Sequence, residues 1–434
     1  MISKHSSLDY SYSRRILPSG LTLVEVHQPH LHRGSISVLF RCGSRFESTN
    51  DNGLSHFLEH MVFRGTEHHT SAYELNLAVE RLGGTLFAAT SPDSTEFEMT
   101  LPSESLVSGA HLLAEVVTCP IFRDIEIERK IVAEEIREDL DEEGNPIDID
   151  FLSRQRLWPG HPLGQSVIGP IDNALRFTVD DIQRHMTAHY VAKKTVVCIS
   201  GAFDAETLLP IIEQEFSRIP DGDGEAPLVP PKHGAGPTIR HTHRPGSQTH
   251  VRIAFNALGG KDPDRIALAI MLGILDDGMS TRLHRRIFDE LGLAYSVSAD
   301  IEMYADAGAL NIDASASHSN VAEIVKQIGR LLEDLRDRPI TDSELHKAKQ
   351  RELWGLETFL DDVSSMSGWY GEQELYWRPM RLHERMVRVD AIESADISRV
   401  ASRVLSREHM HITTVGVLDE DAQKEVERAM HRNY

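Results

Sequence analysis

A stretch rich in proline and glycine, from Pro220 to Pro237, divides this 434-residue chain nearly in half. Such clusters mark linkers rather than regular structure. The chain is too long for one ordinary domain and long enough for two, each with its own hydrophobic core. We therefore predict a first domain over 1–220, a linker over 221–240 and a second domain over 241–434. In each half strands precede long helices, which favours an α+β fold in which helices cover a sheet.

The first half contains the pattern H-x-x-E-H at residues 56–60. On a helix of about 3.6 residues per turn, His56 and His60 project from one face, so two imidazole nitrogens can bind one tetrahedral Zn²⁺. Glu59 lies beside them and can accept the proton of a water whose pKa the metal lowers to about 7. The pattern predicts two metal ligands and a general base.

Residues 54–62 have the apolar periodicity of a helix, with Asp51 or Asn52 as N-cap and Gly65 as a candidate end. Burial of the apolar side would hold the histidines rigidly. Because the chain contains 23 histidines, such a short pattern can also arise by chance. The motif alone leaves both interpretations open, and a third ligand is needed to decide.

A second helix is predicted over 126–138, where apolar residues again recur at helical spacing. Glu128 and Glu135 stand two turns apart on one face of this helix. An acidic stripe of this kind is usually a solvated face. A metal ligand among these glutamates is the alternative, and the stripe itself does not separate the two.

Together these segments resemble the pitrilysin-like (inverzincin) zinc metallopeptidases, in which H-x-x-E-H is followed about seventy residues later by a glutamate ligand on a helix. The family pattern E-R-x-x-V-x-x-E-I matches from Glu128 to Ile136. By this resemblance Glu135 is the third ligand of one Zn²⁺ per chain, Glu128 orients a histidine or the water, and Glu134 is no ligand. Two histidines and one carboxylate leave a position for water, as a catalytic zinc requires.

The resemblance covers nearly the whole chain and is to the smaller, two-domain members such as the mitochondrial processing peptidase subunits. Within it, His161 is interpreted as a structural turn residue. In the second half, residues 249–255 are predicted as a strand and 266–275 as a helix. Residues 273–283 stand where the zinc motif stands in the first half, and they match the metal-free second domain of the family. The expected fold is two homologous domains, each a mostly antiparallel sheet covered by helices and related by an internal repeat.

Residues 83–95 resemble the family's edge strand beside the metal. An unpaired strand offers main-chain donors and acceptors to an extended peptide. Phe87 stands where the family usually has asparagine, so a polar contact is missing, a pocket is more apolar, or the ring simply packs. The predicted substrate-binding residues are Leu86, Phe87, Ala88, Ala89 and Thr90.

Family members often carry an arginine and a tyrosine seven residues apart that polarise the scissile carbonyl. Tyr295 is present, but Phe288 occupies the arginine position, and Arg285 and Arg286 lie nearly one turn earlier. Loss of one such donor costs on the order of a hundredfold in rate or more. Three alternatives follow: the activity is weak, Arg285 or Arg286 replaces the missing arginine, or a partner chain supplies an arginine. We favour the partner, by analogy with the paired subunits of the family.

Charge and cysteine content restrict the partners and the compartment. A formal net charge of −22 would repel phosphates, which argues against nucleic acid and anionic membranes and favours basic or amphipathic peptides. An odd set of three cysteines, Cys42, Cys119 and Cys198, predicts core thiols in a reducing compartment. Without a transmembrane-length apolar run or a signal-peptide block, we expect a bacterial cytoplasmic protein.

Two classes of function remain. The expected one is a zinc endopeptidase or oligopeptidase in which Glu59 activates water, Tyr295 assists, and a homodimer or heterodimer encloses unfolded segments or short peptides. The alternative is a non-catalytic core subunit of a larger assembly, or the zinc-bearing half of an obligate heterodimer. The complete ligand set favours the peptidase, because a structural role needs neither a base nor an open metal position.

Overall fold

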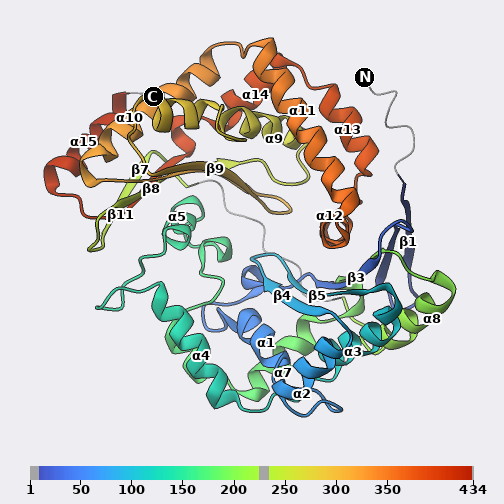
Figure 1. The fold of residues 1–434 in the computed structure, drawn as a ribbon. Helices are drawn as coiled ribbons and strands as arrows, with labels where there is room; N and C mark the ends of the chain where they lie inside the picture. Colours follow the sequence, from blue (N-terminus) through green and yellow to red (C-terminus); the bar gives the residue numbers. More distant parts are fainter. Residues whose placement is uncertain (1–8, 224–233, 433–434) are drawn as a thin grey trace. The chain divides into compact units, whose positions relative to one another are not determined.

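A computed structural model describes residues 9–223 and 234–432, so half of the predicted linker 221–240 lies outside the described residues. The chain divides into two compact units (Figure 1). Each unit includes one segment from the other half of the sequence. The predicted domains, 1–220 and 241–434, did not include this exchange of segments. Leu356–His383 belongs to the first unit, and Asp139–Gly164 belongs to the second.

The first unit is built on a six-stranded sheet with the strand order β1-β2-β6-β3-β5-β4. Neighbouring strands are antiparallel except β2 and β6, which are parallel. The strand β4, predicted as an edge strand, lies at the edge of this sheet. The strands are β1 (Ser11–Ile16), β2 (Thr22–His27), β3 (Arg33–Phe40), β4 (Thr85–Thr90), β5 (Thr95–Pro102) and β6 (Thr195–Gly201).

Helices cover both faces of this sheet, and Figure 1 shows α1, α3 and α7 gathered on one side of it. Successive side chains of a strand point to opposite faces. Gly34 of β3 lies against Leu106 of α3, whereas Ser37 faces α12. The helices are α1 (Leu54–Val62), α2 (Ala72–Arg81), α3 (Leu106–Thr118), α4 (Ile125–Glu138), α6 (Ile171–Arg176), α7 (Val179–His189), α8 (Ala205–Phe216) and α12 (Val363–Tyr376).

The second unit repeats this arrangement with five strands in the order β7-β11-β8-β10-β9. β7 and β11 are parallel, and the other neighbours are antiparallel. In order and direction these strands correspond to β2, β6, β3, β5 and β4, which confirms the predicted pair of homologous, mostly antiparallel sheets. The strands are β7 (Thr238–His243), β8 (Thr249–Ala257), β9 (Ser296–Met303), β10 (Gly308–Ala316) and β11 (Met410–Gly416).

The helices of the second half include the one predicted over 266–275, which is α9. Apart from α12, they are α9 (Arg265–Leu275), α10 (Val321–Asp337), α11 (Asp342–Thr358), α13 (Leu382–Asp390), α14 (Ser394–Val404) and α15 (Glu420–Arg432). Among the described residues no helix combines the length and the apolar character needed to cross a membrane.

The helix α12 packs on β3 and β6 of the first unit although it comes from the second half of the sequence. The Ser367 hydroxyl donates to Ser37 Oγ at 2.8 Å. Gly371 permits the close approach, because a Cβ at this position would lie 2.8 Å from Leu39 Cδ1. A small residue at the contact thus lets the helix backbone lie directly on the sheet.

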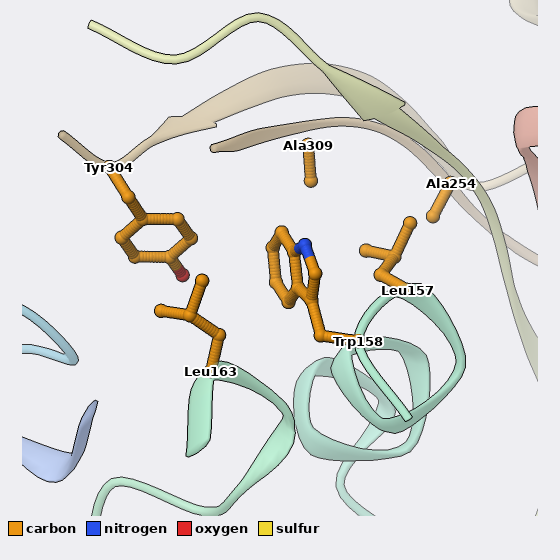
Figure 2. Close-up of a cluster of buried hydrophobic side chains, with 6 residues drawn as sticks. All are labelled: Leu157, Trp158, Leu163, Ala254, Tyr304 and Ala309. Atoms are coloured by element: carbon orange, nitrogen blue, oxygen red, sulfur yellow. The ribbon is translucent and has the colours of Figure 1, made fainter. Parts of the chain in front are cut away.

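The helix α5 (Ile149–Leu157) makes the reciprocal contact, since it comes from the first half and packs on β8 and β11. In Figure 2 the buried indole of Trp158, just after α5, lies between this segment and the second sheet. His161 is buried in the turn that follows, where its Nδ1 accepts from Leu163 N at 3.2 Å. The cluster consists of Leu157, Trp158, Leu163, Ala254, Tyr304 and Ala309.

Candidate metal centre

The helix α1 carries both histidines of the H-x-x-E-H motif, as the periodicity predicted. Its apolar side chains are at most 1% exposed, which anchors the helix in the core of the first unit. His56 and His60 project together from the other side, with ring centroids 4.6 Å apart. The neighbouring helix α4 supplies Glu135 and Glu128.

The donor atoms of His56, His60 and Glu135 converge on one point. The two Nε2 atoms are 3.3 Å apart, and each lies 3.4 Å from a carboxylate oxygen of Glu135. A tetrahedral Zn²⁺ with bonds of about 2.0–2.1 Å holds its donors about 3.3–3.4 Å from one another. These three residues can therefore hold one metal ion. Glu134 pairs with Arg137 instead.

Glu128 lies behind His60, and its side chain is buried. One carboxylate oxygen is 2.9 Å from His60 Nδ1, and the other is 2.8 Å from Nε of Arg64. A carboxylate on Nδ1 fixes the orientation of a ligand imidazole and leaves Nε2 for the metal. The sequence left open whether Glu128 orients a histidine or the water; the contact in the structure is with the histidine.

Negative charge surrounds the imidazoles. Burial opposes protonation of His60, but Glu128 and Glu135 outweigh it and raise the pKa of this imidazole to about 9. Hydrogen bonds with His56 and His60 hold the pKa of Glu135 well below its usual range. An environment that stabilises positive charge in this way also favours a cation where the donors meet. The donor set thus fits Zn²⁺ in both spacing and charge.

Replacing Glu128 by glutamine is expected to weaken zinc binding about 10- to 100-fold, because the amide removes the charge that orients and polarises His60. Competition with a chromophoric chelator measures the affinity. Glu126→Gln is the matched control, since Glu126 lies on the same helix, is exposed and pairs with Arg129. Equal affinities of the two variants would contradict the assigned contact.

Glu59, the predicted base, is held by a residue of the edge strand. Thr90 Oγ1 donates to Glu59 Oε2 at 2.6 Å. Thr90 is one of the residues predicted to bind substrate, and it ends β4 beside α1. This contact holds the Glu59 carboxylate in place, a function that the sequence did not suggest for Thr90.

The predicted substrate strand 86–90 lies within β4 and pairs with β5 along one side. Leu86, Ala88 and Thr90 turn to one face of the sheet, and Phe87 and Ala89 turn to the other. The Phe87 ring is 56% exposed. The interpretation that Phe87 simply packs is therefore wrong, because more than half of its surface faces solvent.

The start of α1 is capped by Glu47, a residue that the sequence did not indicate. Its carboxylate accepts from the backbone N–H of Gly53 at 2.8 Å and of Ser55 at 2.6 Å. Gly53 has a φ of 96°, a conformation that disfavours side chains, so the chain enters the helix without a capping side chain of its own. The prediction that Asp51 or Asn52 caps α1 is wrong, because the preceding turn directs both side chains elsewhere.

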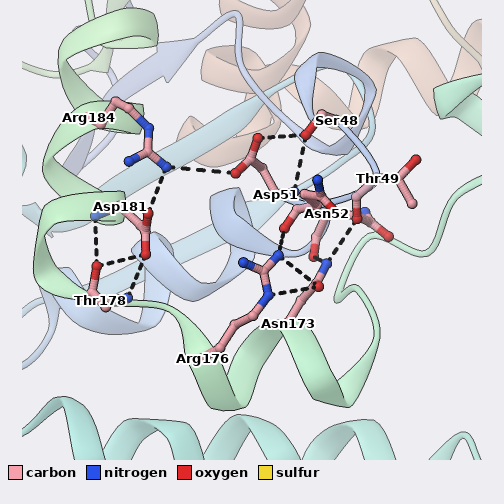
Figure 3. Close-up of polar contacts among 10 residues, drawn as sticks. Ser48, Thr49, Asp51, Asn52, Asn173, Arg176, Thr178, Asp181 and Arg184 are labelled. Carbon is pink, nitrogen blue, oxygen red and sulfur yellow. Dashed lines mark hydrogen bonds and ion pairs between the residues drawn. The ribbon is translucent and has the colours of Figure 1, made fainter.

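Asp51 and Asn52 instead belong to a loop that α6 and α7 hold in place (Figure 3). Asp51 accepts from Ser48 Oγ at 2.6 Å. The amide of Asn173 donates to the carbonyls of Thr49 and Asn52 at 3.1 and 3.0 Å. The loop that leads into α1 is thus fastened by long-range contacts to residues more than a hundred positions away.

Replacing Glu47 by alanine is expected to destabilise the chain by about 2–4 kcal/mol, because it leaves buried donors without an acceptor. Asp51→Ala, at the position that the sequence suggested as a cap, is the control and should stay within about 0.5 kcal/mol of wild type. Chemical denaturation followed by circular dichroism measures both. A larger loss for Asp51→Ala than for Glu47→Ala would show that the capping assignment is incorrect.

Tyr295 and the arginine candidates belong to the second unit. Tyr295 is 78% exposed and precedes β9. Phe288 lies in the π-helix η6 (His284–Glu290) and is partly exposed. Arg285 and Arg286 both pair with Glu290. A catalytic contribution from any of these residues stays a prediction.

Two homologous α+β units, one with an H-x-x-E-H helix facing a distant glutamate, define the pitrilysin-like class of metallopeptidase folds. The sequence comparison agrees. Residues 22–171 match the family model of insulinase (peptidase family M16), and residues 176–352 match that of the peptidase M16 inactive domain. The chain belongs to the M16 peptidase family.

Relatives of the chain come from bacteria and plants. An uncharacterized zinc protease of Mycobacterium bovis is 30% identical over 91% of this chain and 91% of its own length. A probable mitochondrial-processing peptidase subunit beta of Arabidopsis thaliana is 25% identical over 93% of this chain and 78% of its own length. The crystal structure of a protease from Helicobacter pylori superimposes with a TM-score of 0.85 at 23% identity, over 94% of this chain and 100% of that one, which shows the shared fold.

Proposed function

We propose that this chain is a zinc-dependent endopeptidase or oligopeptidase in which His56, His60 and Glu135 hold one Zn²⁺. The observation that carries the proposal is the convergence of two imidazole nitrogens and a carboxylate at 3.3–3.4 Å from one another. When bound there, the ion supplies Lewis acidity toward water and toward the substrate carbonyl. The name of the mycobacterial relative, an uncharacterized zinc protease, supports the same assignment.

Glu59 is the base in this proposal. Its carboxylate would accept a proton from the attacking water and return it to the leaving amine. Because the Thr90 hydroxyl donates to Oε2, the proton would move through Oε1. Thr90 thus fixes the carboxylate in one orientation, which limits the motion that each proton transfer requires.

The substrate would bind as an added strand along β4. A peptide in extended form can pair with the edge of a sheet through main-chain hydrogen bonds, while alternate side chains enter pockets. The exposed ring of Phe87 would then contact a substrate side chain. The net charge of −22 favours peptides that carry basic residues.

Tyr295 would donate a hydrogen bond to the oxyanion of the tetrahedral intermediate. Because Phe288 occupies the place of the expected arginine, and Arg285 and Arg286 are paired with Glu290, we propose that a partner chain supplies this cation. The chain would then act in a homodimeric or heterodimeric chamber in the bacterial cytoplasm. The plant relative is, by its name, a subunit of a larger enzyme.

The test is cleavage of a mixed library of unstructured peptides by the purified zinc-loaded chain, before and after removal of metal by a chelator. Cleavage that is lost with the metal and restored by Zn²⁺ would support a self-sufficient peptidase. Cleavage that appears after a homologous arginine-bearing subunit is added would support the heterodimer. Bound zinc without hydrolysis in either preparation would favour a non-catalytic core subunit.

A further inference from the structure

A second cluster of metal-binding side chains lies in the first unit, apart from His56, His60 and Glu135. It consists of Cys42, just beyond β3, and of His185 and His189 on α7. Their donor atoms all lie within 4.8 Å of one another, and all three side chains are buried. The function proposed above makes no use of them.

The two histidines have the arrangement already seen on α1. His185 and His189 are four residues apart on one helix, and their ring centroids are 4.6 Å apart, as are those of His56 and His60. This spacing places both imidazoles on one face, a turn apart. Cys42 adds a sulfur atom at 3.3 Å from Nε2 of His185. In a tetrahedral zinc site a thiolate and an imidazole nitrogen are about 3.5 Å apart, so the pair nearly has this spacing.

Ser55 of α1 brings a fourth polar atom to the cluster. Its hydroxyl oxygen is 3.0 Å from His185 Nε2 and 3.7 Å from Cys42 Sγ. Ser55 is itself buried and directly precedes His56. The cluster therefore joins the end of β3, the helix α7 and the first turn of α1.

The sulfur and nitrogen donors of this cluster determine which metal ions it can bind. Thiolate and imidazole suit Zn²⁺, whereas Ca²⁺ and Mg²⁺ require oxygen ligands. A closed site without an open position is typical of a structural zinc rather than a catalytic one.

We propose that Cys42, His185 and His189 form a second, buried zinc site, with the Ser55 hydroxyl at the fourth position. On binding, the Cys42 thiol loses its proton to solvent and its sulfur forms the bond to the metal. This ion would clamp α7 and the end of β3 to α1, so it would stabilise the helix that carries His56 and His60 without taking part in hydrolysis.

Cobalt substitution tests the site directly, because a thiolate bound to Co²⁺ gives an intense near-ultraviolet charge-transfer absorption. The His56, His60 and Glu135 set contains no sulfur and cannot produce this band. We expect the full-length chain to bind two Co²⁺ or two Zn²⁺ and to show the band with cobalt. One metal per folded chain and no band would overturn the proposal, and would leave a metal-free network in which the Cys42 and Ser55 side chains bond His185.

Cysteine variants show which sulfur atom produces the charge-transfer band. Cys42→Ser should lower the metal content from two ions to one and remove the band. Cys198→Ser is the matched control, since Cys198 is also buried and outside any disulfide but lies outside the cluster, and it should keep both ions and the band. If Cys42→Ser does not fold, His189→Gln should likewise remove one ion while Glu135→Gln leaves the band intact. A band that survives Cys42→Ser or disappears with Cys119→Ser would also overturn the proposal.

Discussion

Replacing Glu59 by glutamine is expected to lower peptide cleavage by about a hundredfold to ten-thousandfold while the zinc content stays that of the wild type. Glutamine preserves the shape of the side chain and can still bond Thr90 Oγ1, but it cannot accept a proton from water. The three donor atoms that hold the metal are untouched by the change. Catalysis and metal binding should therefore separate in this variant.

The measurement pairs initial rates on an unstructured peptide with elemental analysis of the same preparation. If the wild-type chain needs a partner subunit for activity, both proteins are assayed with that partner. Thr90→Val provides a graded comparison, since it keeps Glu59 but removes its hydrogen bond, and it should lower the rate less than Glu59→Gln does. Full activity of Glu59→Gln would rule out this glutamate as the base.

Replacing Glu135 by alanine is expected to remove one zinc ion per chain and the activity with it. This change deletes one of three protein donors, so the loss of affinity should exceed the about 10- to 100-fold expected for the outer residue Glu128. It also leaves the two imidazoles without the carboxylate that lies 3.4 Å from each. Isothermal titration of the metal-free protein with Zn²⁺ measures the loss.

Glu134→Ala is the matched control for this prediction. Glu134 is the adjacent residue on α4, is exposed, and pairs with Arg137 rather than with a histidine. It should bind zinc and cleave peptide as the wild type does. If Glu134→Ala lost the metal and Glu135→Ala retained it, the assignment of the third ligand would have to be reversed.

Much of the candidate site could be predicted because it depends on local periodicity. The spacing of His56 and His60 and the apolar side of the same segment require a helix with both imidazoles on one face, and α1 has this form. Glu135 is different. The sequence placed it on a helix with an acidic stripe, and the family resemblance was needed to bring it to the histidines, because periodicity carries no information about which distant helix lies beside which.

The contacts that support α1 could not be predicted for the same reason. A cap is usually sought in the residue next to the helix, and Asp51 and Asn52 were reasonable candidates. The loop instead turns Asp51 toward Ser48 and Arg184, and the Asn52 amide donates to Glu47 and to the Ser166 carbonyl. Glu47 reaches the first N–H groups of the helix from six and eight residues away. Only the path of the folded loop decides which acceptor reaches a helix end.

The sequence by itself determined the helices α1, α4 and α9, the strand β8, and the local spacing of the two histidines and the base. These follow from which side chains must be buried together along a short stretch of chain. The tertiary structure decided the rest. It packed α5 on the second sheet and α12 on the first, each against a sheet from the other half of the sequence. It placed Glu128 against His60 and Thr90 against Glu59. It also brought Cys42 into contact with His185, more than a hundred residues away. Such contacts depend on how separate elements pack, and packing is set by the shape of the whole core rather than by any local pattern.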